Sequence, residues 1–165
     1  EDASLVIWTT TPWTIPANLY VAVDADLEYE KVVAEKDGDE DILYIASECV
    51  EDVLRAGRYD DYQTLETMTG DELVGKKYRH PLEDKVPEQD ELDRDGVHEV
   101  YTADFVSAER TGLVHSAPGH GVDDFEVGQE YDLPVFSPVA GDGIYTDEAG
   151  DYSGKFVRDA NDDVI

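Results

Sequence analysis

The chain is poor in cysteine and in apolar runs. Cys49 is its one cysteine among 165 residues, which excludes an internal disulfide and a zinc site built on cysteines, and suits a cytosolic protein. No apolar run reaches the 18 residues that a membrane-spanning helix needs, and no charged-then-apolar leader is present. We therefore expect a cytoplasmic protein without membrane contact. Because Glu1 leads almost directly into an apolar run with no initiator methionine, we also expect a fragment of a longer protein.

Basic residues are the second shortage. The chain has 12 lysines and arginines against 41 acidic residues, for a formal net charge of −29. Self-repulsion on this scale destabilises a compact domain in dilute salt, whereas in molar salt the screening length falls to ~3 Å. We prefer an origin in a salt-accumulating cytoplasm, because the acids are scattered and do not form one block. The alternative is a calcium sponge or a partner for basic proteins, but a complete calcium-loop pattern is missing.

The sequence predicts mostly short β-strands. Hydrophobic residues make up 41% of the chain, with ten tyrosines and two tryptophans, so a packed core is expected. There are about ten strand candidates separated by turns, and two or three helices. Neither βαβ alternation nor a glycine-rich phosphate loop occurs. The pattern predicts a single domain over 1–165 with a mainly β fold: a closed or partly closed β-barrel decorated with a few short helices.

The expected elements follow from apolar patterning and from proline and glycine positions. Strands are expected at 5–8, 19–23, 27–35, 42–46, 62–69, 76–80, 97–105, 112–117 and 135–139. Helices are expected at 48–56, between a Ser47 cap and a Gly57 stop, and at 123–131, with Asp123 as its cap. A closing helix is expected to begin within 156–165.

Groups that bind or titrate are concentrated in 112–131, GLVHSAPGHGVDDFEVGQEY. His115 and His120 could form a metal site with an aspartate, but their spacing matches no helical pair, and we predict no metal. A triad through Ser116 is also disfavoured, because neighbours on an extended strand point to opposite faces. Two adjacent acids at a helix start allow Asp123 to cap while Asp124 faces a substrate ammonium group.

A second dense stretch, WTTTPWTIPAN at 8–18, completes a resemblance. Together with TGLVHSAPGHGVDDFEVGQEYDLPVFSPV at 111–139, it is similar to the editing domain of isoleucyl-tRNA synthetase, an insertion in the catalytic domain of that class I enzyme. Sibling editing domains for valine and leucine usually read Thr-Thr-Arg-Pro and Pro-Ala-His-Asp at the corresponding places. The residues of this chain at those two places favour the isoleucine branch, and the resemblance covers nearly the whole chain.

The resemblance implies a function and a set of site residues. The function would be hydrolysis of valine wrongly attached to tRNA(Ile), and of valyl-adenylate in some accounts, with no cofactor. The catalytic residues would be Thr9, Thr10, Thr11, His115 and Asp124. The substrate-binding residues would be Trp13, Asn18, Gly112 and His120. The partners would be the acceptor end of tRNA(Ile) and the remainder of the synthetase, and the protein would be monomeric.

Individual roles also come from the resemblance. Asp124 would hold the α-ammonium group, and the three threonines would line the pocket and hold the terminal adenosine and the attacking water. For His115 we prefer a steric, positioning role over that of general base, because no carboxylate that could orient it is evident. The family usually has glycine where this chain has Arg110; if that glycine has positive φ, Arg110 is strained. The alternatives are a valyl-type domain that clears threonine, and a non-catalytic acidic binding module.

Overall fold

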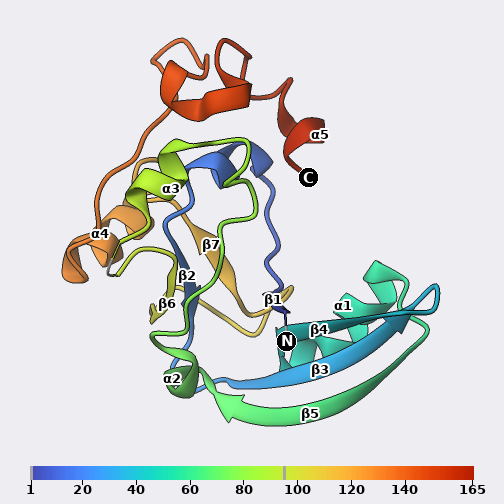
Figure 1. Cartoon of the computed structure of the whole chain (residues 1–165). Coiled ribbons are helices and arrows are strands. Elements are labelled where there is room, and N and C mark those ends of the chain that lie inside the picture. Colours follow the sequence, from blue (N-terminus) through green and yellow to red (C-terminus); the bar gives the residue numbers. More distant parts are fainter. Residues whose placement is uncertain (1, 95) are drawn as a thin grey trace. The chain divides into compact units, whose positions relative to one another are not determined.

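The computed structural model describes residues 2–94 and 96–165 (Figure 1). Its strands are β1 (Ala3–Leu5), β2 (Tyr20–Val23), β3 (Glu28–Lys36), β4 (Asp39–Ala46), β5 (Asp61–Thr69), β6 (Glu99–Thr102) and β7 (Val114–Ser116). Its α-helices are α1 (Val50–Gly57), α2 (Gly70–Leu73), α3 (Glu88–Leu92), α4 (Val122–Glu130) and α5 (Asn161–Val164). Three 3₁₀ helices are η1 (Pro12–Ala17), η2 (Ser47–Cys49) and η3 (Asp147–Tyr152).

The strands form two open sheets. One has four strands in the order β1-β4-β3-β5, with β1 parallel to β4 and the other pairs antiparallel. The other has three strands in the order β6-β2-β7. The prediction of a β-rich fold with short helices is confirmed. A closed barrel is not, because neither sheet closes on itself over the residues that the structure describes.

Internal contacts gather into two compact units. Unit 1 comprises residues 1–8, 21–78 and 100–114, and unit 2 comprises residues 9–20, 79–99 and 115–165. The prediction of a single domain over 1–165 stays a prediction, and each unit is described by itself below.

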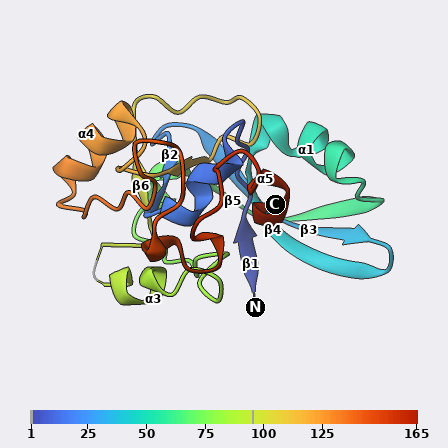
Figure 2. The same ribbon diagram turned by 90° about the horizontal axis from the view of Figure 1, so that it is seen from above.

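Unit 1 is built on the four-stranded sheet. Strands β3 and β4 are joined by a two-residue turn at Asp37 and Gly38, both with positive φ, as expected of an Asp-Gly hairpin. Helix α1 lies against this sheet (Figure 2), and Val50 and Leu54 of α1 belong to the same apolar cluster as Val32 and Ile45 of the strands. Apolar burial and strand register therefore account for this unit.

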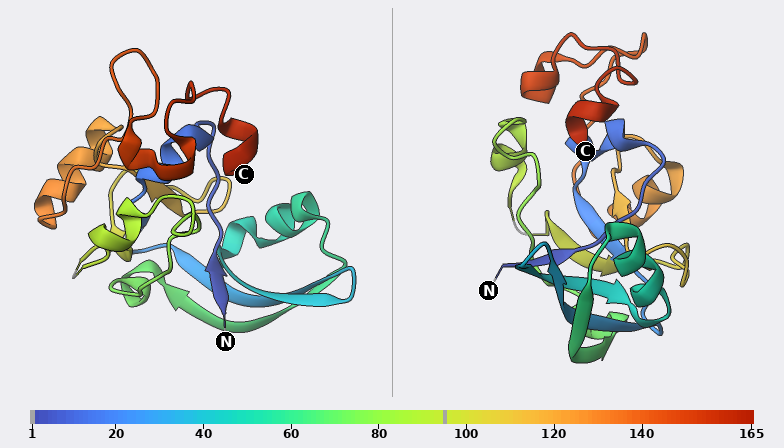
Figure 3. Two further views of the ribbon diagram at one scale, coloured as in Figure 1. Left: turned by 45° about the horizontal axis from the view of Figure 1, so that its top comes forward. Right: turned by 90° about the vertical axis from the view of Figure 1, so that its right-hand side faces the viewer.

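Unit 2 has little regular structure. It contains η1, α3, α4, η3 and α5 (Figure 3). Pro12 opens η1 and Pro16 lies inside it, so the segment lacks two main-chain donors. Side chains from distant parts of the unit donate hydrogen bonds to main-chain carbonyl groups of η1: Tyr145 to Trp13, His80 to Ile15 and Gln89 to Pro16. These bonds fix the conformation of the segment.

Several boundary predictions were right and several were wrong. Strands expected at 19–23, 27–35, 42–46 and 62–69 match β2 to β5. The expected strands at 97–105 and 112–117 shrink to β6 and β7, and the expected strand at 5–8 shifts to β1. No strand forms at 76–80 or 135–139. Pro134 and Pro138 bracket the latter stretch and cannot donate to a ladder, leaving one bridge between Val139 and Tyr145.

Two N-cap predictions were wrong, and one helix stop was right in position but not in its left-handed residue. The hydroxyl of Ser47 is buried without a partner and does not cap α1. Helix α1 does end at Gly57, but the left-handed residue is Arg58, with φ of 61°. Gly121 is the N-cap of α4, and Asp123 lies exposed in its first turn without a capping bond.

Candidate functional site

The three threonines lead into η1. The hydroxyl of Thr9 accepts a hydrogen bond from the main-chain N–H of Thr11 at 3.0 Å, and the two hydroxyl oxygens are 3.4 Å apart. Thr9 is half-buried, whereas Thr10 and Thr11 are exposed. The threonines therefore present hydroxyl groups that solvent or a ligand can reach, as a role in holding water or adenosine requires.

His115, in β7, is held at both ring nitrogens by residues of the η1 region. Its Nε2 is 2.7 Å from the hydroxyl of Thr14, and its Nδ1 is 2.9 Å from Nδ2 of Asn18. The amide Nδ2 of Asn18 is also bonded to the carbonyl oxygens of Tyr20 and Ser116, which identifies it as the donor group. These bonds join two motifs about a hundred residues apart in the sequence.

The same contacts determine where the proton of His115 lies. Because Asn18 donates to Nδ1, that nitrogen has no proton, and the neutral ring has its proton on Nε2. The Nε2–H group donates to the Thr14 hydroxyl, which passes its own hydrogen to the carbonyl of Thr11 at 2.9 Å. Both nitrogens of His115 are thus occupied by protein groups.

Burial keeps His115 neutral. Burial, with a smaller contribution from nearby His120, lowers the pKa of His115 from 6.5 to about 4. A ring that is neutral, with both nitrogens bonded within the protein, has no free lone pair to take a proton from water. This arrangement favours the steric, positioning role predicted for His115.

Asp124 is placed by the first turn of α4. Its Oδ2 accepts a hydrogen bond from the N–H of Ala117 at 2.8 Å. Burial raises the pKa of Asp124, the bond from Ala117 lowers it, and the neighbouring Asp123 raises it. A Cβ on Gly121 would lie 2.8 Å from the Asp124 carboxyl carbon, so a larger residue there would displace the Asp124 side chain. Asp124 is therefore a partly desolvated carboxylate for which an ammonium ion would be a favourable partner.

His120 and Trp13 lie edge to face. Their ring centres are 5.4 Å apart at 79°. Nε2 of His120 is buried and has no hydrogen-bond partner among the described residues. The turn that carries this ring needs Gly119, since a Cβ there would meet the carbonyl oxygen of Phe136 at 2.1 Å. Because this nitrogen is buried, a solvent-borne ligand cannot reach it in this conformation, and a binding role for His120 stays a prediction.

Gly112 belongs to unit 1, apart from the other predicted site residues. Its φ is 71°, and a Cβ would meet the Cβ of Ala46 at 2.3 Å. Its carbonyl accepts a hydrogen bond from the buried hydroxyl of Tyr29 at 2.7 Å. These contacts give Gly112 a structural reason to be glycine, so a binding role for it stays a prediction.

Arg110 adopts the strained conformation expected of it. Its φ is 60°, a left-handed conformation that costs a residue other than glycine ~1–2 kcal/mol. Its guanidinium lies 4.3 Å from the ring centre of Trp8, within unit 1. This cation–π contact offsets part of the strain.

Sequence reasoning missed the residues that hold η1 in place. Thr14 lies inside the motif at 8–18, close to the other three threonines, and this proximity could have identified it as a candidate site residue. No pattern singled out His80, Gln89 or His98, which are buried and approach from 79–99. Across residues 2–94 and 96–165, no group of three or more His, Cys, Asp or Glu side chains could hold a metal ion. Nor does any helix within those ranges have the length and apolarity to cross a bilayer.

Sequence comparison identifies relatives along the entire chain. An isoleucine–tRNA ligase of Haloarcula marismortui is 64% identical over 165 residues, and one of Haloquadratum walsbyi is 61% identical over 165 residues. One of Archaeoglobus fulgidus is 53% identical over 165 residues. Each match covers 100% of this chain but only 15–16% of the relative, so the chain spans about a seventh of their length. No family model matches the chain.

Comparison with solved structures gives the fold. A chain described as GlLeuRS-CP1 superposes with a TM-score of 0.67 at 14% identity, covering 97% of this chain and 78% of that one. The editing domain of P. knowlesi cytosolic leucyl-tRNA synthetase gives a TM-score of 0.58 at 14% identity, covering 76% of this chain and 51% of that one. At such identities the likeness establishes the fold alone, and the fold agrees with that expected from the two motifs.

Proposed function

Since this chain belongs, as one segment, to the isoleucine–tRNA ligase family and has an editing-domain fold, we propose that it hydrolyses valine from mischarged valyl-tRNA(Ile). Valyl-adenylate is a further candidate substrate. The observation that supports this most is the convergence of the two motifs: Thr14 and Asn18 hold both ring nitrogens of His115. One rigid, neutral ring is thereby fixed beside the threonine-rich segment.

A second sieve explains why the family needs such a site. A binding pocket discriminates against a side chain one methylene smaller by only ~1–3 kcal/mol, a magnitude established for isoleucine and valine in this synthetase family. A smaller pocket that admits valine and excludes isoleucine increases the selectivity. His115 would be the wall of that pocket, because its ring is held at both nitrogens and cannot rotate away without losing both bonds.

The chemistry then depends on placing water. Asp124 would bind the α-ammonium group of the valyl ester, and the hydroxyls of Thr9 to Thr11 would hold the terminal adenosine and a water molecule. Water adds to the ester carbonyl, the carbonyl–ribose bond breaks, and the ribose oxygen leaves with a proton. Since His115 has no free lone pair, orientation of the reactants and the neighbouring ribose hydroxyl would supply the rate enhancement.

The partners follow from the same proposal. The chain is a segment of a longer synthetase, whose remainder would hold the body of tRNA(Ile), so that this segment meets only the acceptor end. A net charge of −29 is unusual for a surface that meets RNA. In molar salt, however, little counterion-release energy remains to be gained by a basic surface.

The test compares hydrolysis of Val-tRNA(Ile) and Ile-tRNA(Ile) in molar potassium chloride, by this chain and by the full synthetase. We expect cleavage of the valyl ester only. The substitution Asp124→Asn removes the charge but keeps an acceptor for Ala117, and should lower kcat/KM about 10²-fold. Its matched control is the exposed neighbour, Asp123→Asn, which should change the rate less than about twofold.

Each other outcome has a defined meaning. If neither form of the protein cleaves Val-tRNA(Ile), the proposed activity is wrong and a non-catalytic binding module remains. Cleavage of Thr-tRNA(Val) in preference to Val-tRNA(Ile) would favour the valyl-type alternative. Unchanged cleavage by Asp124→Asn would remove Asp124 from the site while leaving the activity in place.

A further inference from the structure

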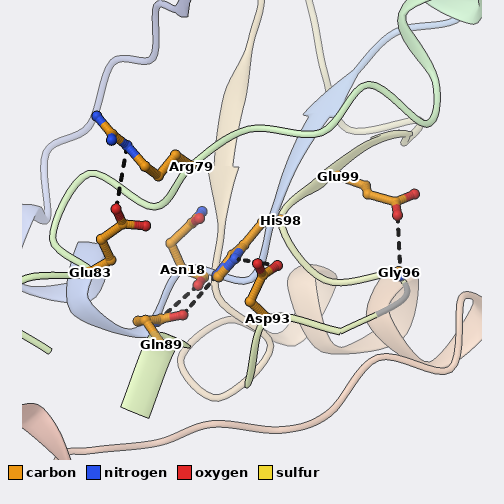
Figure 4. Close-up of polar contacts among 8 residues, drawn as sticks. All are labelled: Asn18, Arg79, Glu83, Gln89, Asp93, Gly96, His98 and Glu99. Carbon is orange, nitrogen blue, oxygen red and sulfur yellow. Dashed lines mark hydrogen bonds and ion pairs between the residues drawn. The ribbon is translucent and has the colours of Figure 1, made fainter. Parts of the chain in front are cut away.

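Gln89, in α3, is a fully buried amide that the proposed chemistry does not use. Its Nε2 donates to the main-chain carbonyls of Pro16 at 2.7 Å and Asn18 at 3.1 Å. Figure 4 shows the amide side chain of Gln89 in contact with both Asn18 and His98. Both hydrogens of the amide nitrogen are therefore donated to carbonyl groups at the end of η1, and Oε1 remains able to accept a hydrogen bond.

His98 supplies the donor for that oxygen. Its Nε2 is 2.9 Å from Oε1 of Gln89, and its Nδ1 is 3.2 Å from Oδ1 of Asp93 (Figure 4). The contact to Gln89 requires a proton on Nε2, because Oε1 can only accept. The Asp93 carboxylate is also an acceptor, so the contact at Nδ1 becomes a hydrogen bond only when His98 is protonated at both nitrogens. His98 thus prevents the amide of Gln89 from flipping, and keeps its two N–H groups aimed at η1.

The backbone of His98 is held in an uncommon conformation. Its φ is 56°, the residue is 3% exposed, and its N–H donates to the carbonyl of Leu19 at 2.8 Å. Histidine tolerates left-handed geometry better than most residues, yet such geometry persists only where surrounding contacts determine it. The constrained backbone of His98 therefore positions its ring next to Gln89.

A third buried side chain completes the set. Nε2 of His80 lies 3.0 Å from the carbonyl oxygen of Ile15, and its Nδ1 accepts the N–H of Leu82 at 3.1 Å. The proton is then on Nε2, which donates to Ile15. The carbonyls of residues 15, 16 and 18 are thus all bonded by buried side chains from 79–99.

Asn18 connects this set to the candidate site. Its carbonyl accepts from Gln89, while its side-chain amide donates to Nδ1 of His115. We propose that Gln89 and His98 are positioning residues that hold Asn18, and through it the ring of His115, in the orientation that discriminates valine from isoleucine. This inference rests on the proposed function for its effect on selectivity, but its structural part can be tested without any tRNA.

The first measurement uses the wild-type chain alone. In molar potassium chloride near neutral pH, the ring ¹⁵N shifts of selectively labelled histidine should show His115 with a protonated Nε2 and an unprotonated Nδ1. They should also show a proton on Nε2 of His98. An unprotonated Nε2 of His98 means that the bond to Gln89 does not exist, and overturns the proposal even if no variant folds.

The second measurement uses Gln89→Met, which keeps an unbranched side chain and removes both amide groups. We expect the His115 ring shifts to move toward a mixture of tautomers. In the full synthetase, the preference for Val-tRNA(Ile) over Ile-tRNA(Ile) should fall about tenfold. His98→Asn, which tolerates positive φ but is too short to reach Gln89, should act in the same direction.

The matched control is Val86→Ala. Val86 is fully buried in the same segment and has no polar side-chain group, so the change lowers stability without touching the Gln89 bonds. It should leave the His115 shifts and the selectivity unchanged. Equal shifts in Val86→Ala and Gln89→Met, or no shift in Gln89→Met, would show a merely structural role and overturn the proposal. Absence of hydrolysis in the wild type overturns the proposed function but leaves these spectra as a separate test.

Discussion

Both units of this chain bury apolar side chains, but they differ in how many polar side chains they bury. Unit 1 packs its sheet and α1 around an apolar cluster that includes Val32, Ile45 and Leu54. Unit 2 contains all four histidines, and six of the seven buried polar residues among those the structure describes: Thr14, Asn18, His80, Gln89, His98 and Ser116. Unit 1 has Thr111 alone.

The difference identifies unit 2 as the part of the molecule that pays the desolvation free energy of buried polar groups, which an apolar core does not require. An apolar core is stabilised by burial whatever the details of its surface. Each buried amide or imidazole instead needs a bonded partner, and is destabilising without one. The predicted site residues, apart from Gly112, lie in the unit that carries this cost. Buried polar groups therefore locate the candidate site better than the apolar core does.

The largest expected effect comes from the apolar unit. Ile45 is fully buried, so Ile45→Ala should lower the free energy of unfolding by about 2–5 kcal/mol, measured by urea denaturation in molar potassium chloride. The ring ¹⁵N shifts of His115 should not move, because Ile45 belongs to the apolar cluster of the other unit. The half-exposed Leu65 is the control, and Leu65→Ala should cost less than about 0.5 kcal/mol. Altered His115 shifts in Ile45→Ala would break the contrast between the units.

Acid should act through the histidine-bearing unit. Burial depresses the pKa of His115 from 6.5 to about 4 in the folded chain. Between these pH values the unfolded state binds more protons, so the contribution of His115 to stability falls as the pH drops from about 6.5 to about 4. The whole drop is on the order of 3 kcal/mol. His80, whose pKa burial and neighbouring His98 lower to about 3, adds a loss of the same sign that extends to lower pH.

The measurement compares the wild type with His115→Gln across this pH range, because the many carboxylates titrate in both. The difference in unfolding free energy between the two should shrink as the pH falls from 6.5 to 4. A difference that is independent of pH would mean that His115 is not desolvated in the folded chain. Direct titration of the His115 ring by NMR provides a second reading of the same pKa.

A smaller effect tests the hydroxyl that accepts from His115. Thr14→Val keeps the branched shape and removes the oxygen, which leaves Nε2–H of His115 without its partner. We expect a loss of about 1–3 kcal/mol in unfolding free energy and a shift of the His115 tautomer, measured by urea denaturation and ring ¹⁵N spectra. Thr14→Ser restores the hydroxyl and should recover the wild-type spectrum. If Thr14→Val keeps that spectrum, the hydroxyl does not determine the tautomer.

The smallest expected effect concerns a helix end in unit 1. Arg58 ends α1 with φ of 61°, so Arg58→Gly should stabilise the chain by roughly 0.5–1 kcal/mol in thermal or urea unfolding. The same change inside the helix, Arg55→Gly, should instead destabilise it by about 1 kcal/mol. Equal signs for the two changes would show that the left-handed geometry of Arg58 carries no strain.

Elements with strong local signals were predictable from the sequence. Strands β2 to β5 follow from β-branched, apolar runs between turn residues, and the Asp37-Gly38 turn follows from the preference of this pair for positive φ. The stretch at 135–139 has similar apolar residues but two flanking prolines, and local composition overstated it. Helix caps were predicted poorly because Gly121 and Arg58, which lack the usual cap chemistry, occupy those positions.

The candidate site also contains residues that the sequence could predict and residues that it could not. The threonines, Trp13, Asn18, His115 and Asp124 could be named from two motifs, since both are contiguous in the chain. Gln89 and His98 could not, because a buried glutamine in an acidic stretch of sequence has no pattern of its own. Gln89 bonds the main-chain carbonyls of residues about seventy positions away. His98 acts through its contact with Gln89.

The sequence by itself determined the family and the acidic character and nominated most candidate site residues, because each depends on composition or on short contiguous motifs. Tertiary structure decided the protonation of His115, since a tautomer depends on partners that only folding brings together. It also decided that the described residues form two open sheets rather than a closed barrel, and that one of the two units buries most of the polar side chains. Strand pairing and buried hydrogen bonds are non-local, so no local pattern could specify them.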